Sequence, residues 1–361
     1  MRGASSPQDS MFSYISLEDR VPASHPLRKL RSLVDVVLGT MSEDFDAVYS
    51  RVGRPSVPPE RLLKALLLQI LFSLRSERLL VESIDYNLLY RWFVGLGIDD
   101  PVWDHSTFSQ NRERLFNADR ARIFFERVRL LADWGKLTSS EHFSVDGTLI
   151  EAWASHKSFR PKDGGDPPSD GGRNAEVDFK GQRRANDTHA STTDPEARLA
   201  RKSHGTESRL AHMGHVLMEN RNGLVVDVEV TEANGTAERA AALAMIQRYC
   251  KPGSTVGADK GYDTADFVRG CRRARVRPHV ACKKAGSALD RRTTRHESYR
   301  TSIRVRKRIE ESFGWLKTVA GLRKTKLIGR AKLAGQALLC FATYNLVRMG
   351  GLAGWWDPHH A

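Results

Sequence analysis

The sequence lacks the features that mark secreted, disulfide-bonded and membrane-spanning proteins. Its most apolar run, residues 62–74, is 13 residues long and contains Lys64 and Gln69, so it is too short to cross a bilayer and indicates a buried helix. The first residues contain no apolar segment of the length that a secretory signal needs. The 4 cysteines are widely spaced, without a Cys-x-x-Cys pair. These absences predict a reduced cytoplasmic protein with unpaired thiols and no membrane contact.

Acidic residues are scarce in one long segment of the chain. Residues 269–332 contain 21 Lys or Arg and only 4 Asp or Glu, an excess greater than the net charge of +14 of the whole chain. Basic charge concentrated in this way suits a polyanion, of which nucleic acid is the commonest. A solvated helix face has a similar composition, so the charge by itself leaves both interpretations open.

The first part of the chain, residues 1–135, has the pattern of an all-helical N-terminal domain. One helix is predicted from Ser56 and the prolines that follow it, and a second runs from Ser76 to a stop at Gly95 and Gly97. A third, short and basic, starts after Asp104. These helices are compatible with a helix-turn-helix DNA reader, and a plain helical bundle has the same pattern.

Residues 136–352 follow a different pattern, in which strands precede alternating helices and strands. A strand is predicted at 142–153, and Asn222-Gly223 joins two further strands in a hairpin. A long polar loop at 156–207 interrupts this part, and residues 353–361 form a C-terminal tail. Three antiparallel strands followed by alternating helices and strands predict an α/β fold, a ribonuclease-H-like mixed sheet with flanking helices.

Two aspartates occupy positions in predicted strands where a structural role is less common. Asp146 stands between Val145 and Gly147 in the first strand, where aspartate is disfavoured unless the strand ends in a turn. Asp259 ends a short apolar strand, the usual place for functional groups in open α/β sheets. Asp263, four residues further, has a ready role as the N-cap of the next helix, so we choose Asp259 as the candidate.

A pair of glutamates interrupts the basic segment, on a helix predicted over 302–319. With Arg306 at zero on a helical wheel, Glu310 lies at about 40°, beside an apolar face, and Lys317 at about 20°. Glu311 lies at about 140° and points to solvent. A surface ion pair of Glu310 with Arg306 is the simplest explanation of Glu310 taken alone. Considered together with Asp146 and Asp259, Glu310 becomes a candidate for a shared metal site.

Three carboxylates on two strands and a following helix can converge on one pocket. Hard carboxylate oxygens suit a divalent cation, and Mg²⁺ fits best. Two such ions activate a water or a 3′-hydroxyl and stabilise the leaving oxygen of a phosphodiester. Chemistry on DNA phosphates needs acidic ligands for metal inside a basic surface, which explains a glutamate pair within a basic segment.

Five ordered segments of the sequence resemble bacterial insertion-sequence transposases of the DDE type, in the group with a C-terminal Arg-x3-Glu-x6-Lys helix. The segments are FSVDGTLIEAWAS, THASTTDPEARL, GHVLMENRNGLVVD, GADKGYD and RKRIEESFGWLK. The resemblance covers nearly the whole chain, including the helical N-terminal part. It implies that Asp146, Asp259 and Glu310 form a metal-binding catalytic triad for two Mg²⁺ ions, for which Mn²⁺ substitutes.

The resemblance also implies DNA-binding residues around the triad. The expected phosphate contacts are Arg306, Lys317, Arg304, Lys307 and Arg308. The family pattern has a tyrosine three residues before the arginine, and here that position is Ile303, so the cleavage route stays open; Tyr299, one turn earlier, is a possible substitute. Trp315 is a candidate for stacking on a base, and Asp194 is explained as a turn residue before Pro195.

The function that the resemblance implies is transposition. Such an enzyme binds the terminal inverted repeats of its element as double-stranded DNA, cleaves strands by metal-assisted hydrolysis and transfers the 3′ ends to target DNA. Two ends are handled together, so a homodimer on DNA is expected, at the nucleoid in the cytoplasm. Two alternatives remain: a ribonuclease-H-like nuclease without strand transfer, and an inactive DNA-binding relic.

Overall fold

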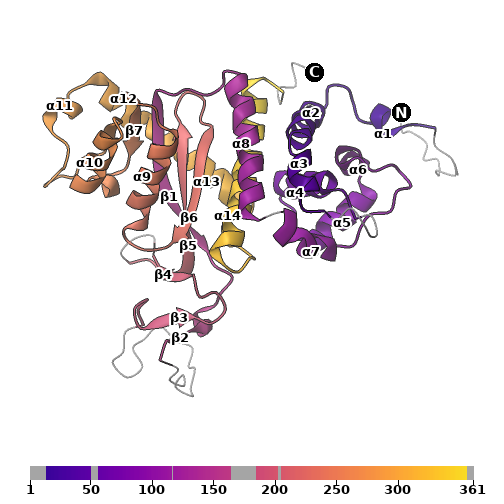
Figure 1. The fold of residues 1–361 in the computed structure, drawn as a ribbon, viewed down its shortest axis with the longest axis horizontal. Helices are drawn as coiled ribbons and strands as arrows, with labels where there is room; N and C mark the ends of the chain where they lie inside the picture. Colours follow the sequence, from indigo (N-terminus) through magenta and orange to yellow (C-terminus); the bar gives the residue numbers. More distant parts are fainter. Residues whose placement is uncertain (1–13, 50–55, 116, 164–183, 202–204, 356–361) are drawn as a thin grey trace, which may run out of the picture.

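A computed structural model describes residues 14–49, 56–115, 117–163, 184–201 and 205–355. In Figure 1 a group of helices from the first third of the chain lies at one end, and a sheet with its covering helices lies at the other. Between them α8 (Ala118–Trp134) and α14 (Arg330–Leu352) run side by side. The predicted division into a helical part and an α/β part is therefore visible in the arrangement of the elements.

The described residues form one six-stranded sheet with the order β4–β5–β1–β7–β8, in which β6 also pairs with β5. Its strands are β1 (His142–Glu151), β4 (Arg198–Ala200), β5 (Arg209–Glu219), β6 (Val225–Glu232), β7 (Thr255–Ala258) and β8 (Arg277–Val280). The pairs β1–β5 and β5–β6 are antiparallel, whereas β1–β7 and β7–β8 are parallel. Three antiparallel strands followed by two parallel ones confirm the predicted ribonuclease-H-like mixed sheet.

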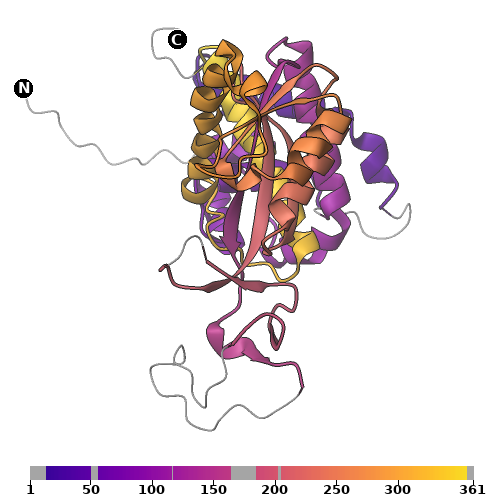
Figure 2. The same cartoon turned by 90° about the vertical axis from the view of Figure 1, so that its left-hand side faces the viewer.

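Different helices cover the two faces of the sheet, because alternate residues of a strand point to opposite faces. Phe143 and Val145 of β1 pack in one hydrophobic cluster with α9 (Ala237–Tyr249) and α10 (Ala265–Arg273). Ile150, at the other parity, packs in a second cluster with residues of α13 (Ile309–Thr318) and α14. Figure 2 shows the sheet between these two layers of helices.

The helical end of the molecule shares its hydrophobic core with α14. Its helices are α1 (Leu17–Arg20), α2 (Pro26–Gly39), α3 (Ser42–Asp46), α4 (Pro59–Leu71), α5 (Glu77–Tyr86), α6 (Leu88–Val94) and α7 (Ser106–Leu115). The single helix predicted after Ser76 is two helices, because the Asn87 side chain accepts hydrogen bonds from the N–H groups of Leu89 and Tyr90 and starts α6. α4 starts at Pro59, after Pro58, which agrees with the helix start predicted from Ser56 and the prolines that follow it.

Helix α8 ties the helical end to the sheet. The Arg122 guanidinium donates to the buried carboxylate of Asp227, at 2.5 Å, and to the carbonyl of Val228 in β6. Tyr249 at the end of α9 donates to Glu126 of α8. Because a buried charge is costly without a partner, these bonds fix the position of α8 on the sheet.

The described ends of the predicted polar loop at 156–207 contain short elements, and the remainder lies outside the described residues. After η1 (His156–Ser158), β2 (Phe159–Pro161) pairs with β3 (His189–Ser191) in a small sheet that projects below the main one in Figure 1. Phe159 packs with Ala152, Ala197 and Leu210 in a small hydrophobic cluster. The buried hydroxyls of Ser158 and Ser191 lie 2.8 Å apart. A few apolar residues among many polar ones are enough to order these ends.

The helix predicted over 302–319 is divided by one tightened turn. Its parts are α12 (Glu297–Val305), η3 (Arg306–Arg308) and α13, preceded by the short α11 (Arg291–Thr294). The backbone of η3 keeps helical angles, with φ −52° and ψ −26° at Arg306, so the chain direction is little changed. The last predicted helix is observed as α14. In the part of the chain that the structure describes, no helix has the length and apolar character needed to span a bilayer.

Candidate active site

Asp146 and Asp259 lie on adjacent strands at one edge of the sheet. The parallel pairing of β1 and β7 places Ser144 opposite Gly257, and each aspartate follows two residues later. By the two-residue period of strands, Asp146 points to the same face of β1 as Ser144, and Asp259 follows the carboxyl end of β7 as the N-cap of η2 (Lys260–Tyr262). They are close enough for the charge of Asp259 to raise the pKa of Asp146. The structure therefore brings these two predicted residues together.

The surroundings of the Asp146 carboxyl group disfavour its negative charge. Burial, and after it the charges of Asp259 and Glu238, raise the pKa of Asp146 from 3.8 to about 7. The Gly147 N–H, 2.8 Å from Oδ1, and the nearby charge of Arg306 act in the opposite direction and do not balance the rise. A divalent cation supplies the charge that such a group lacks, so the pocket fits a metal ion.

The tightened turn η3 lies directly on the sheet beside the aspartates. A Cβ atom at Gly257 would lie 3.2 Å from the Arg306 Cβ and 3.5 Å from the Ser144 Oγ. Glycine at this position of β7 thus lets the backbone of η3 approach the strand. The Arg306 Nε is buried and has no hydrogen-bond partner among the described residues. Arg306 is therefore close to Asp146, as the sequence interpretation requires.

The two glutamates of α13 have different surroundings, although both are exposed. Glu310 lies one turn after Arg306, and the segment of η3 and α13 contacts β1. Glu311 lies near α14, where its charge raises the pKa of the buried Tyr344 hydroxyl, after the larger effect of burial. Ile309 and Leu316 are buried as the helical wheel predicts. That Glu310 faces the aspartates stays a prediction.

A complete three-ligand metal site is absent from the described residues: no three His, Cys, Asp or Glu side chains gather closely enough to hold an ion. Asp146 and Asp259 are adjacent, and Glu310 lies on the neighbouring segment without joining them in such a group. Convergence of the three carboxylates stays a prediction.

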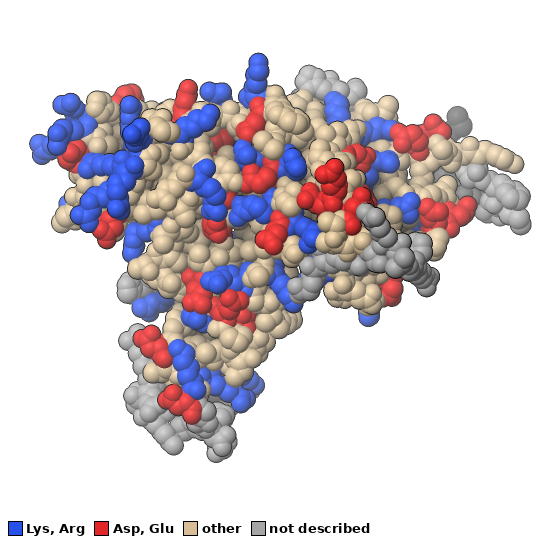
Figure 3. Space-filling view, viewed as in Figure 1, with Lys and Arg blue, Asp and Glu red and all other residues tan. Residues whose placement is uncertain are grey.

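Basic side chains gather around this edge and over α10 to α12, where blue atoms cluster at one end of the molecule in Figure 3. Arg304 and Lys307 are exposed. Arg308 is partly buried, and its Nη1 donates to the carbonyls of Asn220 and Arg221, at 2.9 Å each. Arg308 therefore supports the β5–β6 turn, whatever it does for DNA.

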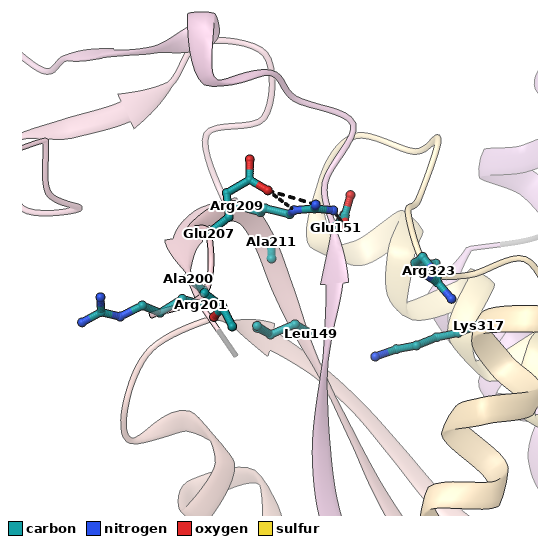
Figure 4. Close-up of a pocket in the computed structure, with 10 residues that line it drawn as sticks. Leu149, Glu151, Ala200, Arg201, Glu207, Arg209, Ala211, Lys317 and Arg323 are labelled. Carbon is teal, nitrogen blue, oxygen red and sulfur yellow. Dashed lines mark hydrogen bonds and ion pairs between the residues drawn. The ribbon is translucent and has the colours of Figure 1, made fainter. Parts of the chain in front are cut away.

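Lys317 lies further along α13, at a hollow of about 420 Å³. Figure 4 shows Lys317 pointing toward Leu149 of β1, with Arg323 beside it and Arg209 bound to Glu207 and Glu151 across the hollow. Asp146 and Asp259 do not line this hollow. Lys317 therefore lies beside Leu149, toward the carboxyl end of β1, and its part in holding DNA stays a prediction.

The N-cap role predicted for Asp263 is wrong. Thr264 caps α10 by accepting from Phe267 N–H. Asp263 is buried and accepts instead from the N–H groups of Lys283 and Ala288, at 2.8 Å each, which holds the loop after β8. Since both of its oxygens are occupied, the choice of Asp259 as the available carboxylate gains support.

Two residues of this region were missed from the sequence, Glu238 and Tyr262. Glu238 stands in the first turn of α9, where an acidic residue is explained by the helix dipole. Tyr262 lies three residues after Asp259, at the end of η2 (Lys260–Tyr262), and its sequence context suggests only a core residue. The Glu238 carboxylate and the Tyr262 hydroxyl both lie close enough to Asp259 for its charge to act on them. Nothing in the local pattern distinguishes them, because their proximity arises only when α9 packs on the sheet.

Three further candidate residues have packing roles. The Tyr299 hydroxyl donates to the carbonyl of Val280, at 2.9 Å, and lies beside β8. Trp315 packs edge-on against Tyr344, with ring centroids 5.6 Å apart. Asp194 is fully buried, with Oδ2 at 3.0 Å from the His212 Nε2. Stacking of Trp315 on a base stays a prediction.

Comparisons with known proteins agree with this architecture. A family model described as "Transposase DDE domain" matches residues 138–346, and one described as "Transposase domain (DUF772)" matches residues 15–114. The chain belongs to the DDE transposase family. The transposase thus carries two matched regions, with α8 between them. Enzymes of this family cut and join DNA and use divalent metal ions.

Solved structures give only a distant likeness. A piggyBac transposase synaptic complex with hairpin DNA is 7% identical, covers 91% of this chain and 76% of its own, and has a TM-score of 0.43. A pre-cleavage Mos1 transpososome is 12% identical, with coverages of 84% and 82% and a TM-score of 0.20. No curated protein matches the transposase.

Proposed function

We propose that the transposase binds the terminal inverted repeats of an insertion sequence, cleaves DNA strands there and transfers the 3′ ends to target DNA. The observation that carries this proposal is the pair Asp146 and Asp259, side by side on β1 and β7 beneath the basic turn η3. An acidic pocket inside a basic surface is what chemistry on DNA phosphates requires.

The metal set in this proposal is Asp146, Asp259 and Glu310, holding two Mg²⁺ ions or Mn²⁺ in their place. The raised pKa of Asp146 supports it, because a cation stabilises the charged carboxylate. Bound metal would supply activation of the attacking oxygen and stabilisation of the leaving oxygen. Arg306, near Asp146, would orient a phosphate at the edge of the sheet.

DNA contacts are assigned to both ends of the molecule. Residues 1–135 would read the element ends, and Arg304, Lys307 and Lys317 would hold the backbone, with Arg308 supporting the turn behind them. Two ends must be joined together, so we propose a homodimer on DNA that works at the nucleoid in the cytoplasm. Residues 136–352 would carry the cleavage and joining steps.

Asp146→Asn tests the proposal. The substitution removes the charge and keeps the size, so end cleavage in Mg²⁺ should fall by at least about 100-fold while end binding stays near wild type. Cleavage of labelled end DNA and a mobility-shift assay measure the two effects. Full cleavage by the variant would remove Asp146 from the site. Joining of a 3′ end to a target plasmid separates a transposase from a nuclease, and wild-type cleavage excludes an inactive relic.

A further inference from the structure

The first turn of α9 delivers a carboxylate to the edge of the sheet from the face opposite η3. A Cβ atom at Gly147, the residue after Asp146, would lie 2.9 Å from the Glu238 Oε1. Glycine at this position therefore leaves room for Glu238 beside β1. Glu238 is partly buried, and burial followed by the charge of Asp259 raises its pKa. Glu238 is thus close enough to Asp146 and Asp259 for the three charges to interact, and a partly buried carboxylate in such a place needs a compensating partner.

A buried hydroxyl lies near the same carboxylates. Tyr262 is 1% exposed, and its hydroxyl has no hydrogen-bond partner among the described residues. Its electrostatic neighbours are Asp146, Glu238 and Asp259. Its ring is fixed by packing on Phe267, with centroids 5.2 Å apart. Leaving a buried donor unsatisfied is costly, so an unpartnered hydroxyl near these carboxylates indicates that a hydrogen-bond partner is still to be supplied there.

His215 adds a second unsatisfied group on the β5 side. It is fully buried, and its Nε2 lies 2.7 Å from the Thr231 Oγ1, whose own hydrogen is donated to the Glu232 carbonyl. The ring must then donate from Nε2, which leaves Nδ1 as an acceptor. Nδ1 has no partner and lies 3.4 Å from the same Cβ position at Gly147 that Glu238 approaches. Two acceptors facing one small region favour a cation there.

We propose that Glu238 is a fourth carboxylate of the metal pocket, opposite Glu310, and that the unpartnered Tyr262 hydroxyl becomes its hydrogen-bond donor when an ion is bound. The pocket would then be closed from both faces of the sheet, by α9 on one side and by η3 and α13 on the other. This inference rests on the proposed metal-dependent function of Asp146 and Asp259. Tyr262 is a positioning residue, since it acts on the metal through Glu238.

Binding of Mn²⁺ to the full chain without DNA tests the role of Glu238, with affinity measured by calorimetry and melting measured in EDTA and in Mn²⁺. Glu238→Gln should weaken Mn²⁺ binding by about 10- to 100-fold. It should melt in EDTA no lower than wild type, because it removes repulsion among carboxylates. Wild-type Mn²⁺ affinity in this variant would overturn the assignment. The matched control is Glu60→Gln, at the same second position of α4, which should leave Mn²⁺ binding unchanged.

Glu238→Asp separates a metal ligand from a helix-dipole partner. Aspartate serves the dipole as well as glutamate does, but its carboxylate is one methylene shorter. We expect Mn²⁺ affinity to stay reduced in this variant; recovery to the wild-type value would show a helix-start role and overturn the proposal. Tyr262→Phe should weaken binding several-fold, and unchanged affinity would remove Tyr262 from the pocket.

The same measurements distinguish failure of this inference from failure of the proposed function. If wild type and Asp146→Asn both fail to bind Mn²⁺, the metal site itself is disproved. If wild type binds Mn²⁺, Asp146→Asn does not and Glu238→Gln binds normally, only the role of Glu238 is disproved.

Discussion

At the scale of single residues, neighbours decide which acid is available for chemistry. Asp263 and Asp259 are four positions apart, yet Asp263 is bound by two backbone N–H groups, whereas Asp259 accepts only from Gly261 N–H in the described contacts. Glu310 and Glu311 are adjacent, and only Glu311 lies near Tyr344. Sequence proximity therefore says little about function, and packing says more.

Glu310 and Glu311 offer a paired test of the triad. Glu310→Gln should lower end cleavage by at least about 100-fold, because a metal ligand is lost. Glu311→Gln changes the same charge on the other side of α13 and should cleave at nearly the wild-type rate. The measurement is the rate of cleavage of labelled end DNA, at protein concentrations that bind the same fraction of the DNA for each variant and for wild type. Reversed losses would place the wrong glutamate at the metal.

His279 makes the folded protein sensitive to acid. Burial, aided by the charges of His142 and Arg277, lowers its pKa from 6.5 to about 4, and its Nδ1 lies 2.7 Å from the Ser302 Oγ. A depressed histidine pKa means that the unfolded chain takes up the proton first. The contribution of His279 to stability should therefore be complete above pH 6.5 and fall toward pH 4, by on the order of 3 kcal/mol.

Urea unfolding at several pH values measures this effect. His279→Gln should be less stable than wild type at pH 7 but should lose less stability between pH 6.5 and pH 4. His156→Gln, in η1, provides the control and should follow the wild-type profile. Parallel profiles for wild type and His279→Gln would show that another group carries the acid sensitivity.

At the scale of elements, the position of η3 depends on a missing side chain in β7. Gly257→Ala would place a methyl group 3.2 Å from the Arg306 Cβ, so η3 must move away from the sheet. We expect a loss of about 1 to 2 kcal/mol in stability and a larger relative loss of cleavage than of DNA binding. Gly314→Ala in α13 meets open space and should stabilise the protein by about 0.5 to 1 kcal/mol. Equal behaviour of the two variants would contradict this explanation.

Element boundaries were the part of the fold that the sequence predicted least well. Strand order, the β5–β6 hairpin and the last helix follow from alternation, an Asn-Gly turn and apolar periodicity. The break at Asn87 was missed because its side chain competes with the helical backbone, a choice that the surrounding apolar pattern hides. The small β2–β3 sheet was missed because its core consists of very few apolar side chains.

At the scale of the whole molecule, charge is distributed so that basic side chains gather at the end of the sheet domain. The end carrying α10 to α12 is the bluest part of Figure 3, and red atoms are more frequent toward the middle and the helical end. This arrangement predicts DNA binding dominated by phosphate contacts. With about six such contacts, affinity for DNA of any sequence should fall on the order of 10³-fold between 50 and 200 mM salt.

Fluorescence anisotropy over a salt series measures this dependence. The double variant Arg304→Ala and Lys307→Ala should reduce the slope of log affinity against log salt by about 2, since two counterions fewer are released. The double variant Arg160→Ala and Lys251→Ala removes the same two charges from exposed positions outside the proposed phosphate contacts and provides the control. A flat response in wild type would contradict a phosphate-dominated interface.

The sequence by itself predicted the fold class and the family, which are confirmed, and it singled out Asp146 and Asp259 as candidates, because strand alternation and strand-end placement are local and periodic. Only the tertiary structure decided which side chains share the edge of the sheet. Glu238 reaches Asp146 past Gly147, and Arg306 reaches it past Gly257, through contacts between segments far apart in the chain. Such contacts depend on how closely two backbones approach, and no pattern within one segment encodes that distance.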